Sequence, residues 1–172
     1  MKSKFHAGEI EVQTRAGVQD IARRVAGVLR STIPPVAREF LEGQRMVVVS
    51  TVDSRGRVWA SILTGEPGFI QALDEQTVQI NAELIPGDPL VENLRTRRDI
   101  GILAIELSTR RRMKLKGRSE LGEYGSIYVH AERVYALCPK YIQAREVVGR
   151  VDQATTERLI RHAESLDENQ QR

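Results

Sequence analysis

The chain has 172 residues and a surplus of three positive charges, from 26 Lys and Arg against 23 Asp and Glu. This length fits one domain, and 41% hydrophobic, 28% charged and 5% aromatic residues make a soluble globular composition. These values exclude a fibrous or disordered chain. The small net charge does not favour bulk attraction to nucleic acid or to a membrane surface.

The chain holds one cysteine, Cys138, and three histidines. A single cysteine cannot form an intrachain disulfide, and no spacing typical of a zinc site occurs. The N-terminus is basic but continues into Gly, Glu and Gln instead of an apolar stretch, and no apolar run approaches the ~18 residues of a membrane helix. We therefore expect a cytoplasmic protein without a membrane span or a metal site.

Two helices are predicted near the N-terminus and one near the C-terminus. Apolar residues recur at helical spacing over residues 18–30, and a short helix is expected over residues 36–43, between a proline pair and a glycine. Residues 155–166 place their apolar side chains on one helical face. The N-terminal pair and the C-terminal helix therefore flank a central region of different character.

The central region predicts strands. Residues 46–52 are β-branched on both faces, and the turn residues that follow, with Gly56, predict a hairpin. A turn and a first-turn proline before residue 90 predict a helix over residues 90–97. The six expected strands are residues 46–52, 57–64, 76–82, 99–107, 111–121 and 126–137.

Six strands joined by tight turns favour a mainly antiparallel β-barrel with flanking helices. No parallel βαβ series is visible. We predict a single domain over residues 1–172, with a helical segment over 1–44, the barrel core over 45–138, and a C-terminal turn and helix over 139–172.

Residues 95–118 concentrate positive charge, with nine basic residues against two acidic ones. In the strand that begins near residue 110, Arg110, Arg112, Lys114, Lys116 and Arg118 share one face. The pattern fits either a solvated barrel exterior that blunts edge pairing or a site for an anion. Arg111 shares the opposite, apolar face with Met113 and Leu115, so we expect it to have a partner.

Motifs for other chemistries are weak. Neither glycine-rich nucleotide motif and no GxSxG nucleophile motif occurs. The turn over residues 64–68 could donate hydrogen bonds to a phosphate, although most such turns only reverse the chain. Cys138 precedes Pro139 and Lys140, and a buried structural cysteine is favoured over a reactive thiol. The sequence leaves the catalytic residues unknown.

Seven short motifs occur in order along the chain. They are Phe5-His-Ala-Gly-Glu9, Val12-Gln-Thr-Arg-Ala-Gly17, Asp53-Ser-Arg-Gly-Arg-Val-Trp-Ala-Ser61, Leu63-Thr-Gly-Glu-Pro-Gly-Phe69, Pro86-Gly-Asp-Pro-Leu90, Thr109-Arg-Arg-Arg-Met113 and Cys138-Pro-Lys-Tyr-Ile-Gln143. With them the chain resembles the FMN-binding split-barrel family related to pyridoxamine 5'-phosphate oxidase over most of residues 5–148. It is most similar to the branch described as oxidase-like or flavin-nucleotide-binding.

The resemblance implies a homodimer of six-stranded antiparallel split β-barrels that holds FMN between its two copies. Its expected FMN contacts are Ser61, Ile62, Leu63, Thr64, Asn81, Arg111 and Arg112. The arginine fork suits either the phosphate or the flavin ring. We add Lys140 to the site, because Pro139 must turn the chain away from the barrel rim, and we expect Cys138 to be shielded there while the residues after Lys140 anchor the turn.

Departures from the family pattern weigh against vitamin B6 oxidation. The true oxidases carry a Ser-Arg-Lys phosphate motif before the central helix, where this chain has Gly87, Asp88 and Pro89. They also have Arg-Gln where this chain has Arg111 and Arg112, and their C-terminal substrate segment is not found. The related branch often has Asn where this chain has Leu137.

We therefore expect an FMN-binding flavoprotein, an oxidoreductase that acts on an unidentified small substrate. One alternative is a flavin-binding or sensing module without turnover. A second is a basic adaptor for nucleic acid, which would require the positively charged segment to be wholly exposed. A deazaflavin or haem on the same fold also remains open.

Overall fold

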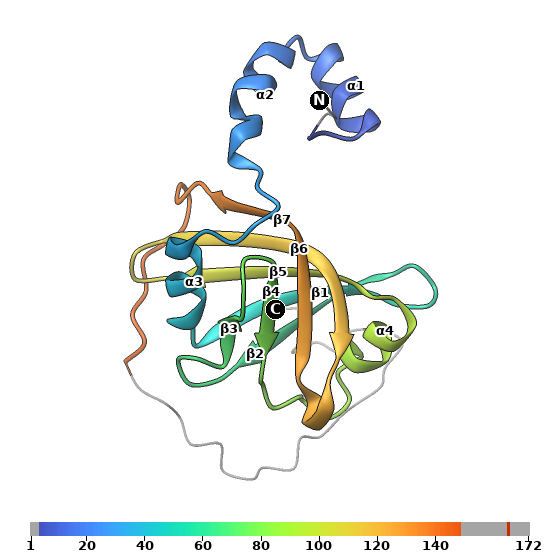
Figure 1. Ribbon diagram of the computed structural model, residues 1–172, viewed down its shortest axis with the longest axis vertical. Helices are drawn as coiled ribbons and strands as arrows, with labels where there is room; N and C mark the ends of the chain where they lie inside the picture. The colour runs from blue at the N-terminus through green and yellow to red at the C-terminus, as the bar shows by residue number, and fades with distance from the viewer. Residues whose placement is uncertain (1–3, 149–164, 166–172) are drawn as a thin grey trace.

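The computed structural model describes residues 4–148 and residue 165. Seven strands form one antiparallel sheet that curls into an open barrel, with helices around it (Figure 1). The strands are β1 (Met46–Val52), β2 (Val58–Thr64), β3 (Ile70–Ala72), β4 (Thr77–Ile80), β5 (Asp99–Glu106), β6 (Arg111–Leu121) and β7 (Ile127–Leu137). The helices are α1 (Ala7–Arg15), α2 (Gln19–Val25), η1 (Ala26–Val28), α3 (Pro35–Glu42), α4 (Leu90–Thr96) and η2 (Glu123–Gly125).

The mainly antiparallel β fold with flanking helices is confirmed. The strand order is β2-β1-β5-β6-β7-β4-β3, so β2 and β3 lie at the two edges. The six predicted strands are all present, and the seventh, β3, is a three-residue strand that pairs with β4. The expected helix over residues 155–166 lies outside the described residues.

A register shift between Lys116 and Gly117 interrupts the β6–β7 pair. A Cβ atom on Gly117 would stand 1.9 Å from the carbonyl oxygen of His130, so only glycine allows the two backbones to approach so closely. Such a bulge bends the strand and increases its twist. The bend helps the sheet to curl around the core.

The core fills the inside of the barrel. Alternate residues of β1, β5 and β6 point inward, as the burial along each strand shows. Helix α3 begins and ends one residue earlier than the predicted range of 36–43, and it buries Phe40 and Leu41 at one end of the barrel. Helix α4 buries Leu90 and Leu94 in the same core. No described helix is long and apolar enough to cross a membrane.

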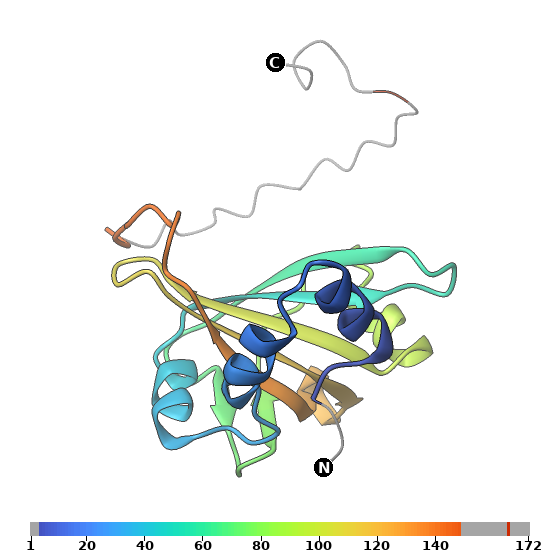
Figure 2. The same cartoon turned by 90° about the horizontal axis from the view of Figure 1, so that it is seen from above.

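The N-terminal helices stand apart from the barrel. Figure 1 shows α1 and α2 projecting beyond the sheet, and Figure 2 looks down on them from above. Helix α1 buries no side chain and α2 buries only Ala22. The predicted helix over residues 18–30 is therefore too long, because regular α-helix ends at Val25 and a 3₁₀ turn follows. Helix α1 was not predicted.

The outer sheet face is the solvent side of β2, β1 and β5. Val48 of β1 lies between Ile62 of β2 and Leu103 of β5, and these three apolar side chains form one row. Leu103 in turn pairs with Lys114 of β6. Ile62 is 51% exposed. The apolar outer sheet face therefore ends directly at the cationic strand β6.

Candidate functional site

Strand β2 places its four predicted site residues alternately inside and outside the barrel. Ser61 and Leu63 are each only 2% exposed, whereas Ile62 and Thr64 face outward. The Ser61 hydroxyl donates a hydrogen bond of 2.7 Å to the Asp88 carboxylate. Among the described strands, β2 pairs only with β1. A ligand can therefore meet the side chains of Ile62 and Thr64 and the free backbone edge of β2.

A small hollow of about 30 Å³, roughly the volume of one water, lies between β2 and the segment that leads into α4. Its lining is Ile62, Leu63, Leu84, Ile85, Asp88, Leu90 and Val91. The Asp88 carboxylate also accepts a hydrogen bond from the Leu90 N–H at 2.8 Å. Because its one charged lining group is an acid, the hollow does not suit a phosphate, which agrees with the departure seen in the sequence.

Asn81 lies apart from β2. Its side-chain oxygen accepts a hydrogen bond of 2.8 Å from the Ser126 hydroxyl, and its backbone N–H donates to the Phe69 carbonyl at 2.7 Å. Both bonds tie it to its own edge of the sheet. The side chain is exposed, so a ligand that reaches this segment could still contact it.

Arg111 has the partner that its position requires. Its guanidinium forms an ion pair of 2.8 Å with Glu106 and lies 5.1 Å from the centre of the Phe40 ring. Hydrogen bonds from Thr109 and then from Arg111 hold the pKa of Glu106 below its usual range. Arg111 is thus occupied within its own chain, and its exposed side can add a contact to a ligand only at the barrel rim.

Arg112 is only partly satisfied. Its Nη2 donates a hydrogen bond to the carbonyl oxygen of Cys138. Its Nε is buried and has no hydrogen-bond partner among the described residues. A buried donor without an acceptor is costly and rare in folded proteins. Arg112 therefore has an unused donor beside the outer sheet face.

The residues after β7 are open to solvent. Cys138 is exposed, which makes the expectation of a shielded cysteine wrong for the single chain. Tyr141 is 89% exposed, at a φ of 70°, so it does not anchor the turn either. Lys140 lies 5.2 Å from the centre of the Tyr141 ring. Cys138 and Tyr141 are exposed because the chain leaves the end of the sheet here, and no described segment covers these residues.

The structure thus divides the predicted residues into separate groups. Arg112 reaches the exit from β7 through its bond to the Cys138 carbonyl, and Lys140 follows two residues later. We call Arg111, Arg112, Cys138 and Lys140 together the rim. Ser61 to Thr64 lie on β2, with β1 and β5 between β2 and β6. Three strand spacings of roughly 4.8 Å correspond to about 14 Å between the two backbones. One chain alone does not bring the two groups together.

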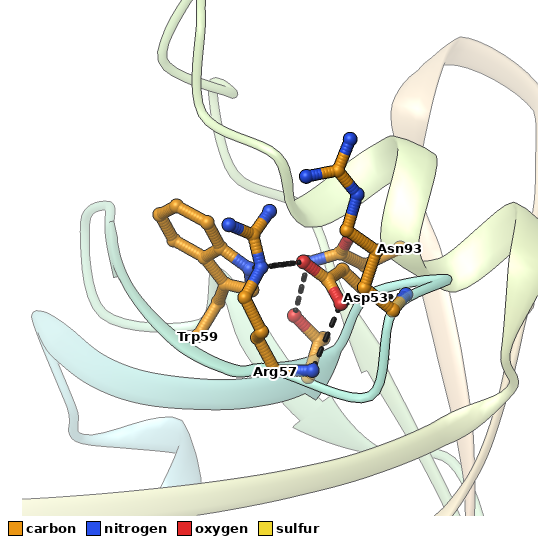
Figure 3. A network of polar contacts seen from close by, with 6 residues as sticks. Asp53, Arg57, Trp59 and Asn93 are labelled. Atoms are coloured by element: carbon orange, nitrogen blue, oxygen red, sulfur yellow. Dashed lines mark hydrogen bonds and ion pairs between the residues drawn. The ribbon is translucent and has the colours of Figure 1, made fainter.

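A polar network that was not predicted lies at the β1–β2 turn (Figure 3). The Asp53 carboxylate accepts hydrogen bonds from the backbone N–H groups of Arg55 and Arg57, both at 2.9 Å. It also accepts from Arg57 Nε at 2.7 Å and from Trp59 Nε1 at 3.0 Å. These bonds, that from Trp59 above all, hold the pKa of Asp53 far below its usual range.

The turn itself could be foreseen from Asp53 and Gly56, but the network could not. An aspartate that begins a turn commonly accepts backbone N–H groups two or more residues later. The contact with Trp59 depends on the side chain's orientation across the hairpin. Next to this network, buried Asn93 of α4 donates a hydrogen bond of 3.0 Å to Thr51 of β1, which fixes the helix against the strand.

No group of three or more His, Cys, Asp or Glu side chains that could hold a metal ion occurs in the part of the chain that the structure describes.

No family model matches the chain, and no curated protein matches it either. Distant likenesses occur among solved structures. HupZ of Group A Streptococcus has 18% identity and a TM-score of 0.49, with 60% of this chain and 94% of that one covered. A candidate pyridoxamine 5'-phosphate oxidase of Lactobacillus delbrueckii has 14% identity and a TM-score of 0.49, with 62% and 95% covered. An FMN-binding protein of Syntrophomonas wolfei has 9% identity and a TM-score of 0.47, with 76% and 97% covered.

The matched structures thus include proteins of the group that the sequence resembles.

Proposed function

We propose that this chain is a flavoprotein that binds FMN between two copies of itself and exchanges electrons between the flavin and a small substrate. The position of Arg112 carries the proposal, because this half-buried arginine lies at the border between an apolar sheet face and a cationic strand. A ligand with a flat apolar ring and an anionic tail suits such a border.

The residues present fit FMN in three ways. The outer sheet face around Val48, Ile62 and Leu103 offers an apolar surface to the ring. The free edge of β2 offers backbone donors and acceptors to the polar side of the ring. Arg112 and Lys140 offer cations to the phosphate. When bound, FMN supplies two-electron chemistry of its own, so a proton-donating catalytic residue is not required.

A second copy of the chain is needed in this proposal. The cations of the rim and the edge of β2 are separated by two strands within one chain. The exposed side chain of Ile62 and its apolar neighbours would be covered if two outer sheet faces met. Such a pairing would bring Arg112 of the partner subunit toward β2. The homodimer therefore completes the site and removes apolar surface from water.

Asp88 limits both the choice of substrate and the orientation in which FMN can bind. Its carboxylate occupies the position where a phosphate-binding cation would be expected in a true pyridoxamine 5'-phosphate oxidase, and Ser61 donates to it. We therefore assign the FMN phosphate to the rim and do not propose vitamin B6 oxidation. The substrate is a small molecule of a class that the site does not yet define.

The two rival functions make different demands on the same residues. A nucleic-acid adaptor would need the basic segment to be wholly exposed, but Arg112 is half-buried and Arg118 forms an ion pair of 2.8 Å with Asp99. This observation favours the flavin. A flavin-binding module without turnover would use the same contacts as the enzyme, so only reduction of the bound flavin separates the two.

The visible absorption spectrum of the freshly purified protein tests the proposal. We expect the bands of oxidised flavin, because no group of the polypeptide absorbs there. A colourless protein that fails to bind added FMN contradicts it. Anaerobic mixing with NADH and NADPH then tests turnover: bleaching by either donor supports the oxidoreductase, and no bleaching by both favours the binding module.

A further inference from the structure

A second and larger cleft lies beside the network at the β1–β2 turn, on the other side of the first turn of α4 from the hollow. Its volume is about 250 Å³, and its lining includes the buried residues Asp53 and Asn93. Arg57 and Trp59 line it from the hairpin, and Pro89 and Glu92 line it from α4. Pockets for drug-sized ligands start at about 300 Å³, so this cleft suits a smaller molecule.

The hairpin wall of the cleft is held rigidly. Asp53 binds both Arg57 Nε and Trp59 Nε1, and the Arg57 guanidinium lies 5.5 Å from the centre of the Trp59 ring. Figure 3 shows the guanidinium beside the indole. The two terminal nitrogens of Arg57 make no hydrogen bond to any residue that the structure describes. They form a preorganised fork of the kind that binds a carboxylate with two hydrogen bonds.

The helix wall carries the opposite charge. The side chain of Glu92 is 75% exposed, and its distance to Arg95 is 3.7 Å, which is long for an ion pair between exposed groups. The Glu92 carboxylate therefore remains open to a cation. Arg57 and Glu92 thus present opposite charges to the cleft, beside their partners Asp53 and Arg95. A ligand that carries one charge of each sign satisfies both walls.

We propose that this cleft binds a small zwitterion of the size of an amino acid. Its carboxylate would be bound by the terminal nitrogens of Arg57, and its ammonium group by the carboxylate of Glu92. An apolar side chain would pack against Pro89 and Trp59, a residue that is 38% exposed. This site is separate from the proposed FMN site, since no residue that lines the cleft is among the proposed FMN contacts.

Trp59 allows a direct test, because it is the one tryptophan of the chain. Its fluorescence is titrated at constant FMN content with L-leucine, with 4-methylpentanoate, which lacks the ammonium group, and with 3-methylbutylamine, which lacks the carboxylate. We expect a saturable change in emission with L-leucine and at least tenfold weaker binding of both analogues. No change with L-leucine, or equal binding of L-leucine and either analogue, overturns the proposal.

Three variants locate the site. Glu92→Gln removes the proposed ammonium partner at an exposed position, where the fold tolerates the change, and Arg57→Gln removes the carboxylate partner. Each should weaken L-leucine binding at least tenfold. Arg55→Gln is the matched control, since Arg55 lies on the same turn but does not line the cleft. Wild-type affinity in Glu92→Gln, or an equal loss in Arg55→Gln, contradicts the assignment.

Discussion

The β1–β2 turn and the rim both carry arginines, but one chain completes only the first. At the turn, Asp53 accepts four hydrogen bonds and fixes Arg57 and Trp59 in place. At the rim, Arg112 keeps a buried Nε without a partner in the described chain, and Cys138 is exposed. The Asp53 carboxylate is thus fully hydrogen-bonded within one chain, whereas Arg112 keeps a donor that the described chain does not satisfy, and in our proposal FMN and a second copy complete the rim.

The outer sheet face extends from one of these regions toward the other. A substitution on this face should therefore weaken dimer formation and FMN binding and leave the network at the turn intact. A substitution at the turn should instead change the stability of a single chain. The predictions below use this contrast.

The largest expected effect is that of Ile62→Glu. A buried charge at the centre of the proposed dimer contact, without a partner, should convert the dimer to a monomer and abolish FMN binding. Sedimentation velocity and FMN titration measure both. Leu73→Glu is the control, because Leu73 and Ile62 are each 51% exposed but Leu73 lies between β3 and β4. An Ile62→Glu protein that remains a dimer would show that another surface joins the copies.

Asp53→Asn should give the largest loss of stability among single-chain effects. An amide nitrogen would face N–H donors where a carboxylate oxygen now accepts them, so we expect a clear fall in Tm. Cys138→Ala, at the exposed rim, should leave Tm unchanged. Thermal unfolding followed by circular dichroism compares the two variants. Equal Tm values for Asp53→Asn and Cys138→Ala would contradict the view that the Asp53 network stabilises the single chain and the rim does not.

The same aspartate predicts a pH dependence. Because the pKa of Asp53 is lower in the folded chain than in the unfolded one, its ionised form stabilises the fold above the unfolded pKa of about 3.9. That stability is lost as the pH falls through this value toward the folded pKa. Urea unfolding between about pH 6 and about pH 3 should therefore show a smaller decline for Asp53→Asn than for the wild type. Asp74 and Glu106, whose pKa values are also lowered, contribute equally in both proteins.

Arg112→Ala should weaken FMN binding by about 1.5 to 3 kcal/mol, the range for a hydrogen bond to a charged group. Titration of the apoprotein with FMN measures the loss. Arg110→Ala is the matched control, since Arg110 lies in the turn before β6 and should matter less. Unchanged FMN affinity in Arg112→Ala would show that the cationic face of β6 is a solvated barrel exterior and not an anion site.

Lys140→Met should have the smallest effect. The change keeps the stem and removes the charge, and an exposed ion pair contributes about 0.2 to 1 kcal/mol. FMN affinity should fall by that amount, and the rate of flavin reduction should change with it. If both keep their wild-type values, Lys140 has no part in the site.

Much of the barrel could be predicted from local patterns. The β-branched run of β1, the alternation in β6 and the turn at Gly56 are short-range features, and the structure has a strand or a turn at each place. The alternating burial along β1 was not predicted. Helix α1 was missed because its N-terminal cap is His6, which pairs reciprocally with Glu9 in a capping box usually begun by Ser or Thr. Strand β3 was missed because three residues are too few to show a period.

The site was harder to predict because it depends on distant pairing. The need of Arg111 for a partner followed from its place on the apolar face of β6, and Glu106 meets it. The bond between Ser61 and Asp88 joins residues far apart in sequence, so no spacing indicates it. Whether Cys138 is covered depends on what lies beyond the end of β7, which strand periodicity does not address.

The sheet order also has a consequence for the growing polypeptide. Strand β4 pairs with β3 on one side and with β7 on the other, where Thr77 pairs with His130. The β4–β7 hydrogen bonds can therefore form only after β7 has been synthesised. During synthesis β4 and its neighbour would remain a two-stranded hairpin, which is marginally stable in water, until the last strand is made. Closure over so long a sequence separation is slow. A nascent chain that stops before β7 would therefore expose two unpaired strand edges, and it is the form of this protein most prone to aggregate.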